Sequence, residues 1–312
     1  MLERAHARAK ICPVVTRPRA HPVDLTERVA AWRDGGDVEE VRGRRLFVRR
    51  RAGGGPLLAL LHGFPSSSYD WRGLLEHLPG RAALALDFVG FGLSEKPADH
   101  VYSLAWQAHA VEELVRRAGS PPTVVVAHDM GTSVATELMA RDLAGELTFP
   151  LEHALLFNGS ILLDRASPTV GQKLLRSPGG ALFARLTSKA TFRRQFARLF
   201  SPDHPLTRAE ANDQWCLLAL DGGARMAHRL IHYMDERERL TDRWHGAFRD
   251  WPGDLSLVWG LRDPVATVSV LEGLRELRPG IRVTELPQLG HYPQIEDPAA
   301  IAAAVSAALS HG

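Results

Sequence analysis

Cysteine is nearly absent from this chain. The 312 residues include only Cys12 and Cys216, and their separation matches neither a disulfide framework nor a zinc-binding motif. No apolar run approaches the roughly 20 residues that a membrane-spanning helix needs, and the charged N-terminus lacks the apolar segment of a secretory signal. We therefore expect a cytoplasmic protein without a metal site.

An excess of charge of either sign is also missing. The net charge is +2, and lysine occurs only at positions 10, 96, 173 and 189, so arginine supplies most of the basic residues. Such a balance gives no electrostatic reason to expect a nucleic-acid partner or an anionic membrane. The length and the 45% hydrophobic content suit one large α/β domain with an insertion, or two modest domains, and leave the oligomeric state open.

Residues 123–135, which read TVVVAHDMGTSVA, are the most informative stretch. Three β-branched valines at 124–126 predict a strand buried on both faces, and residues 132–143 have the spacing of a helix. A sharp strand-turn-helix of this kind is the setting of a nucleophile elbow, in which the residues two before and two after the nucleophile must be small. Ala127 and Gly131 occupy those positions, and the nucleophile position holds Asp129.

An aspartate at this position changes the chemistry. A carboxylate is a poor acylating nucleophile, but it can displace a leaving group from an sp3 carbon and form an ester that water then hydrolyses. The helix N-terminus and the N–H of Met130 favour the charged form. The alternative interpretation is that Asp129 is an ordinary helix N-cap.

Strands alternate with helices along most of the chain. Strand patterns occur in an antiparallel pair over 37–51 that turns at Gly43, and at 56–61, 82–86, 124–126, 151–157, 255–259 and 281–286. Helical patterns occur at 66–78, 104–118, 132–143, 268–277 and 298–309, the last with Asp297 as its cap. This alternation predicts an α/β fold with a mostly parallel eight-stranded sheet and right-handed crossovers.

The alternation is interrupted once. Residues 160–251 read as helices broken by proline and glycine, with no strand candidate, which predicts a helical cap inserted after the sixth strand. Residues 37–159 and 252–312 then form the core. Residues 1–36 are rich in arginine, proline and histidine and are expected to form an arm that is partly disordered or lies over the surface.

Two further residues complete a candidate triad. Asp263 follows the seventh strand and His291 the eighth, at the ends where open α/β sheets bind their ligands. The chain order Asp129, Asp263, His291 is nucleophile, acid, histidine. In addition, the N–H groups of Phe64, in the sequence HGFP, and of Met130 are candidates for an oxyanion hole, and Phe64–Pro65 is a candidate cis peptide bond.

The segments HGFPSSSYDW, DFVGFGLSEKP, AHDMG, WGLRDP and GHYPQIEDP resemble the α/β-hydrolases with an aspartate nucleophile, the epoxide hydrolases and haloalkane dehalogenases. The resemblance is strongest to the epoxide-hydrolase-like branch of the mesoderm-specific transcript proteins, and it spans residues 37–309. It implies a cofactor-free enzyme and a small apolar organic substrate. By the resemblance, Asp129 attacks carbon, His291 activates water and Asp263 orients the histidine.

The leaving group separates the subfamilies. An epoxide oxygen needs a proton donor, and relatives use two cap tyrosines, whereas this cap holds only Tyr233, so a second donor is missing or replaced, with His232 as a candidate. A halide needs N–H donors, but Met130 and Phe64 stand where dehalogenases carry them, and Trp215 is the remaining candidate. We therefore favour an epoxide.

Further candidates for lining the pocket are His62, His128, Asn158, Trp215 and His232. A haloalkane dehalogenase and a non-catalytic scaffold that binds a small ligand or a protein remain alternatives, with an esterase the least compatible.

Overall fold

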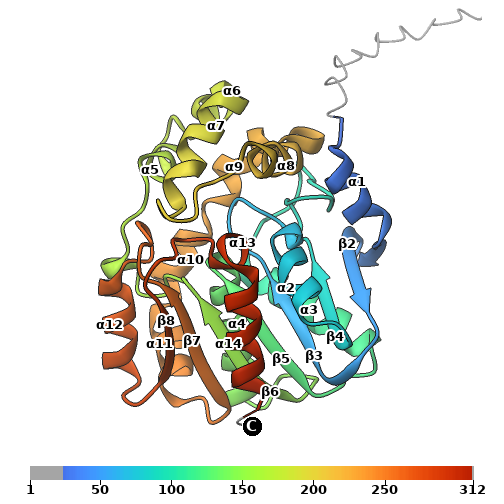
Figure 1. The fold of residues 1–312 in the computed structure, drawn as a ribbon, viewed down its shortest axis with the longest axis vertical. Coiled ribbons are helices and arrows are strands. Elements are labelled where there is room, and N and C mark those ends of the chain that lie inside the picture. Colours follow the sequence, from blue (N-terminus) through green and yellow to red (C-terminus); the bar gives the residue numbers. More distant parts are fainter. Residues whose placement is uncertain (1–23, 311–312) are drawn as a thin grey trace, which may run out of the picture.

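The computed structural model describes residues 24–310 and contains an eight-stranded sheet (Figure 1). The strand order is β1-β2-β4-β3-β5-β6-β7-β8, in which β1 and β2 are antiparallel to their neighbours and the other strands are parallel. The strands are β1 (Asp37–Val41), β2 (Arg44–Arg51), β3 (Gly54–Leu61), β4 (Arg81–Leu86), β5 (Thr123–His128), β6 (Leu151–Phe157), β7 (Asp254–Gly260) and β8 (Arg282–Leu286). The predicted α/β-hydrolase architecture is therefore confirmed.

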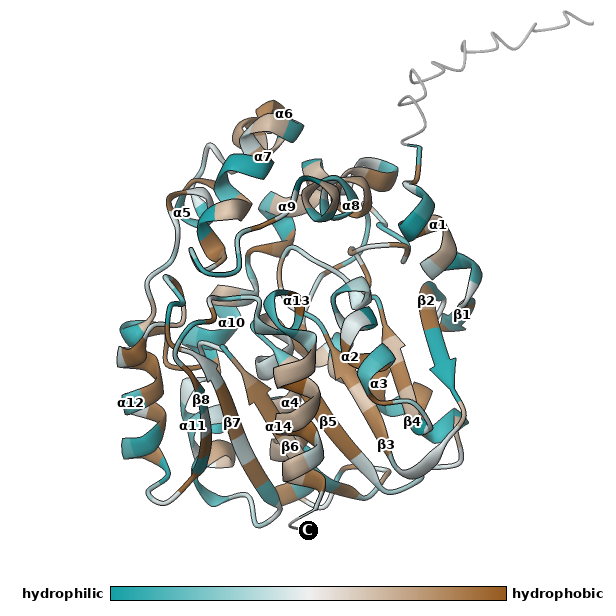
Figure 2. Cartoon of the chain, viewed as in Figure 1, coloured by the Kyte–Doolittle hydropathy of each residue, from teal (hydrophilic) through white to brown (hydrophobic). Residues whose placement is uncertain are grey.

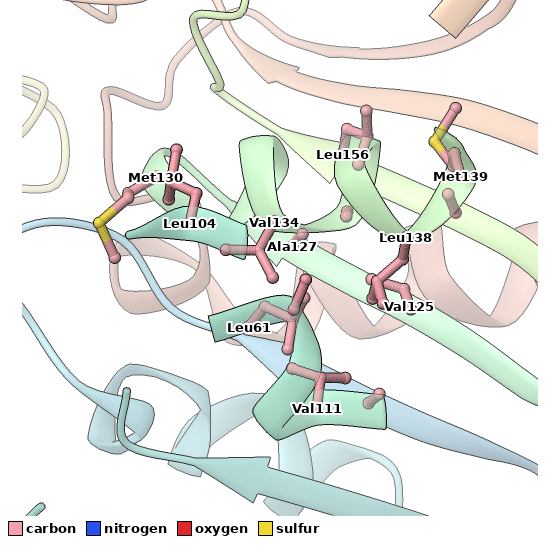
Figure 3. Packing of buried hydrophobic residues seen from close by; sticks show 14 of the residues in the cluster. Leu61, Leu104, Val111, Val125, Ala127, Met130, Val134, Leu138, Met139 and Leu156 are labelled. Carbon is pink, nitrogen blue, oxygen red and sulfur yellow. The ribbon is translucent and has the colours of Figure 1, made fainter. Parts of the chain in front are cut away.

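Helices cover both faces of this sheet. One apolar cluster joins the sheet to α3 (Leu104–Arg117), α4 (Met130–Leu143), α11 (Thr241–Asp250) and α12 (Val268–Leu277). The other joins it to α1 (Glu27–Asp34), η1 (Ser68–Trp71), α2 (Arg72–His77) and α14 (Pro298–Leu309). Figure 3 shows the first cluster, in which Leu61 and Val125 of the central strands face Val111 of α3 and Val134 of α4. Because β3 and β5 are buried on both faces, their sequences are continuously apolar.

Between β6 and β7 the described chain forms only helices. They are η2 (Leu163–Arg165), α5 (Val170–Arg176), α6 (Gly180–Leu186), α7 (Lys189–Phe196), η3 (Ala197–Leu199), α8 (Arg208–Ala219), η4 (Leu220–Gly222), α9 (Gly223–Leu230), α10 (Tyr233–Arg239) and α11. Helices α5 to α9 lie beyond one end of the sheet (Figure 1), whereas α11 returns to pack against α4. A short helix, α13 (Pro293–Glu296), follows β8.

Most of the predicted elements after residue 100 agree with the structure to within two residues, and the side chain of Asp297 caps α14 by accepting from the N–H of Ala300. The predicted helix at 66–78 is instead a 3-10 turn followed by α2. Of the expected N-terminal arm, residues 1–23 lie outside the described part. Residues 27–34 form helix α1, which the sequence analysis did not predict and which buries Val29 and Trp32. No helix in residues 24–310 has the length and hydrophobicity to cross a membrane.

Candidate active site

Asp129 stands on the sharp turn between β5 and α4. Its backbone has φ 47° and ψ −110°, a conformation that costs energy for a residue with a side chain. A Cβ atom added at Gly131 would lie 2.6 Å from the carbonyl oxygen of Leu61, so the turn tolerates no side chain there. The side chain of Asp129 makes no capping hydrogen bond to α4. The N-cap alternative is therefore wrong, because the strained turn directs the carboxylate away from the helix.

The carboxylate of Asp129 is held by the loop after β3. Its Oδ2 accepts a hydrogen bond of 2.9 Å from the N–H of Phe64, one of the two predicted oxyanion donors, and the Phe64–Pro65 bond is cis as predicted. Gly63 allows this approach, because a Cβ atom there would lie 2.8 Å from Cβ of Asp129. The role of the Met130 N–H stays a prediction.

His291 and Asp263 are adjacent at the ends of β8 and β7. His291 Nδ1 donates to Asp263 Oδ2 at 2.7 Å, and the side-chain amide of Asn158 donates to the same oxygen at 2.8 Å. The other oxygen of Asp263 accepts from the N–H groups of Val265 and Ala266. Burial works against protonation of His291, but Asp263 and Asp129 outweigh it and raise the pKa of the imidazole. A buried histidine with a fixed tautomer and a raised pKa has the properties of a general base.

The predicted pocket residues His62 and His128 support the loops. His62 accepts from the N–H of Phe88 at Nε2 and donates from Nδ1 to the carbonyl of Gly63 at 2.8 Å. His128 Nε2 bonds to the carbonyl of His291 at 2.7 Å. Burial lowers the pKa of both rings, to about 3 for His128. Both rings are therefore uncharged and serve to hold the loops in place. Asn158 also has a structural role, since its side chain hydrogen-bonds to the backbone of Gly260.

A buried arginine beside Asp129 was missed in the sequence analysis. Arg237 of α10 donates from Nε to the hydroxyl of Ser133 at 2.8 Å and from Nη2 to the backbone carbonyl of Asp129 at 3.1 Å. The same Nη2 lies 3.8 Å from Oδ1 of Asp129, and both side chains are 2% exposed. A signal was present in the sequence, because Arg237 is four residues after Tyr233 and shares its helix face.

Tyr233 lies between this arginine and the Phe64 loop. The Arg237 guanidinium stacks over its ring at 4.7 Å, and the ring centroids of Tyr233 and Phe64 are 5.8 Å apart. Burial, followed by the charge of Asp129, raises the pKa of the phenol well above its ordinary value. The phenol therefore stays protonated and lies within electrostatic range of Asp129, as a proton donor must.

An elongated cavity of about 270 Å³ reaches this group of residues from the helices α5 to α9. Its wall includes Phe64 and His291 but neither Asp129 nor Tyr233. Tyr233 is next to the wall, because its ring centroid is 5.8 Å from that of Phe64. Most of the remaining wall is apolar, and its polar side chains are Thr169, Gln172, Thr187, Gln195 and Arg198. Apolar cavities with a few polar groups are typical of small-molecule sites.

None of the five further candidates for lining the pocket belongs to the wall of this cavity, and two of them lie away from this site. His232 is half exposed and pairs with Asp235 at 2.5 Å on the surface, so it does not replace a proton donor. Trp215 packs against Phe192 at 5.6 Å between centroids and does not line the cavity. In residues 24–310 no group of three histidine, cysteine, aspartate or glutamate side chains is arranged to hold a metal ion.

Comparison with known proteins agrees with this architecture. The profile of the alpha/beta hydrolase family matches residues 58–304. A putative hydrolase of Mycobacterium tuberculosis, LipZ, is 56% identical over 88% of this chain and 96% of its own length. The mouse mesoderm-specific transcript protein is 34% identical over 89% of this chain and 86% of its own length.

Solved structures with a similar fold include enzymes of both suspected subfamilies. The epoxide hydrolase CorEH has a TM-score of 0.72 at 20% identity and covers 88% of this chain and 98% of its own. The haloalkane dehalogenase DbeA of Bradyrhizobium elkani has a TM-score of 0.73 at 21% identity and covers 88% and 97%. At these identities the likeness establishes the fold and does not distinguish the two reactions.

Proposed function

The chain belongs to the alpha/beta hydrolase family, and we propose that within this family it hydrolyses small apolar epoxides to diols through an ester on Asp129. One observation carries the proposal. The Asp129 carboxylate accepts a hydrogen bond of 2.9 Å from the Phe64 N–H, near the hydrogen-bonded pair of Asp263 and His291, and His291 lines the cavity. With Oδ2 held by the backbone, Oδ1 is the oxygen that attacks.

In the first step, Oδ1 of Asp129 attacks an epoxide carbon. The new carbon-oxygen bond forms as the ring bond breaks, and the ring oxygen takes a proton from Tyr233. The product is an alkyl ester of Asp129 with a hydroxyl on the neighbouring carbon. Tyr233 is protonated before the ring opens, and the charge of Arg237 favours proton release because it lowers the pKa of the phenol against the effect of burial. The Arg237 guanidinium over the tyrosine ring stabilises the phenolate that results.

In the second step, His291 takes a proton from a water molecule, whose oxygen attacks the ester carbonyl carbon. The oxyanion that develops on the carbonyl oxygen is stabilised by the Phe64 N–H, with Met130 as the second donor. Collapse of the adduct expels the product alkoxide, which takes the proton of the new carboxyl group, so the diol leaves and Asp129 is again a carboxylate. The proton held by His291 replaces the one that Tyr233 lost, so the sum is epoxide plus water to diol. Asp263 stabilises the imidazolium throughout.

Two alternatives stay open to experiment. Halide displacement needs no proton but does need N–H donors around the leaving ion, and the position of Trp215 against Phe192 weakens that reading. A non-catalytic scaffold has no need for the strained turn at Asp129 or for the hydrogen-bonded pair of His291 and Asp263. The intact arrangement therefore favours an enzyme.

The covalent ester gives the direct test. The variant His291→Gln is expected to form the ester but not hydrolyse it. After incubation with terminal epoxides that the wild type converts, the peptide containing Asp129 should gain the mass of the substrate. The matched control is Asp129→Asn with the same epoxides, which should gain none. An adduct on another residue, or no adduct with a substrate that the wild type turns over, would contradict the mechanism.

A further inference from the structure

Helices α5 and α6 carry an unusual group of exposed apolar side chains. Val170, Leu174, Leu182 and Leu186 are 69%, 42%, 63% and 71% exposed, and they are four of the eight large hydrophobic side chains exposed in residues 24–310. Within each helix the two are four residues apart and therefore share a face. The helices pack against each other, and Figure 2 shows their hydrophobic residues at the end of the molecule far from the sheet. We call these four residues the apolar rim.

The apolar rim borders the cavity. Val170 belongs both to the rim and to the cavity wall, and Phe183 and Thr187 of the wall follow Leu182 and Leu186 directly in sequence. Such a group on the surface of a monomer often marks a binding site, because the removal of each apolar side chain from water is favourable. The rim therefore lies where a lipophilic molecule would enter.

The chain segment that carries the rim has charge of one sign only. No aspartate or glutamate occurs from residue 165 to residue 202. Six exposed basic side chains of this segment make no ion pair within the described chain: Lys173, Arg185, Lys189, Arg193, Arg194 and Arg198. By contrast, two other arginines of the segment, Arg165 and Arg176, pair with acids of other elements. Unpaired cations around apolar side chains are the composition of a helix that binds at an anionic lipid interface.

We infer that the surface formed by α5, α6 and α7 docks on an anionic lipid bilayer. The rim would enter the boundary between headgroups and acyl chains, while the cations contact lipid phosphates. A second copy of the chain is a poorer occupant, because face-to-face packing would bring two sets of unpaired cations together. The net charge of +2 gave no reason to expect an anionic membrane partner, but residues 165–202 carry a local excess of positive charge. Docking on vesicles is measured without substrate turnover, so its result is independent of whether the proposed epoxide hydrolysis is correct.

Vesicle cosedimentation tests the inference with the full chain. Vesicles of phosphatidylcholine mixed with an equal part of phosphatidylglycerol should retain the protein at low salt and release it as salt rises. Pure phosphatidylcholine should bind much less. The double variant Arg193→Gln with Arg194→Gln should weaken binding about 25-fold, or roughly fivefold for each charge. Leu182→Ser with Leu186→Ser should weaken it at least about tenfold.

Matched controls lie far from the rim. Arg42→Gln with Arg45→Gln removes two exposed charges from the turn and strand after β1, and Val101→Ser changes a side chain that is 82% exposed; neither should alter binding. Equal binding to both kinds of vesicle, or equal losses in the control variants, would overturn the inference. So would a dimer in sedimentation velocity that the Leu182 and Leu186 changes dissociate, because the rim would then be a contact between copies.

Discussion

Arg237 bonds to the backbone of the turn at Asp129, whose carboxylate accepts a hydrogen bond from Phe64. Its Nη2 bonds to the backbone carbonyl of Asp129 at 3.1 Å and lies 3.8 Å from Oδ1, while the Phe64 N–H bonds to Oδ2. Burying a guanidinium costs desolvation free energy. Here the hydroxyl of Ser133 offsets part of that cost by accepting a hydrogen bond from Arg237 Nε. The turn and one carboxylate oxygen are thus fixed before any substrate binds, which reduces the reorganisation needed for attack, while Oδ1 accepts no hydrogen bond from residues 24–310.

Arg237→Gln is therefore expected to slow formation of the ester by about 10²-fold, the loss that a misplacement of about 1 Å can cause. The rate is measured in single turnover in the His291→Gln background, which isolates the first step. Arg239→Gln is the control, because that side chain is 70% exposed on the same helix and its loss should leave the rate unchanged. Equal rates in both variants would show that Arg237 serves only packing.

Tyr233→Phe removes the proposed proton donor and keeps the ring that stacks with Arg237. Epoxide turnover should fall by about 10²–10⁴, the range for general acid assistance, with the circular dichroism spectrum unchanged. Tyr102→Phe is the matched control, since its hydroxyl donates to the carbonyl of Pro97 away from the site. Undiminished turnover in Tyr233→Phe would remove the main reason for preferring an epoxide to a halide.

The pH response of His291 follows from its neighbours. Burial opposes its protonation, but Asp263 and then Asp129 raise its pKa above the ordinary 6.5. NMR titration of the ring should give a midpoint above 6.5, which falls in Asp129→Asn and falls further in Asp263→Asn. Ester hydrolysis requires the neutral ring and so should increase with pH through the midpoint. Asp263→Asn should also reduce turnover by about 10⁴; a larger loss in Glu296→Gln would show that the acid is misassigned.

Asp70 makes the stability of the fold depend on pH. Burial raises its pKa from 3.8 to about 7, and Gln214 donates to one of its oxygens at 2.8 Å. The folded state therefore holds a proton that the unfolded state releases near pH 4, and stability is lost as pH rises through about 7. Asp70→Asn should increase the free energy of unfolding at pH 8 by up to a few kcal/mol, as measured by urea denaturation. Asp99→Asn, at an exposed position, should not; an unchanged Asp70→Asn would refute the shift.

Local sequence was sufficient for much of the fold and for part of the site. The triple valine, the helix spacing and the small residues around Asp129 are local signals, and β5, α4 and the turn follow from them. The cis bond at Pro65 is similarly local. Helix α1 was not predicted because its sequence ERVAAWRD has only two large apolar residues. It is stabilised by the burial of these two, Val29 and Trp32, against other elements.

The sequence by itself determined which groups stand at the strand ends, because parallel strands bring Asp129, Asp263 and His291 to one edge regardless of the insertion. It did not determine which inserted residues face Asp129. That choice depended on how α10 packs, since a helix presents several faces and only tertiary contacts select one. The packing buried Tyr233 and Arg237 beside the carboxylate and left His232 in solvent. The folding of the insertion also brought the exposed apolar and basic residues of α5 to α7 to the surface. The net charge of the whole chain, +2, does not reveal this local composition.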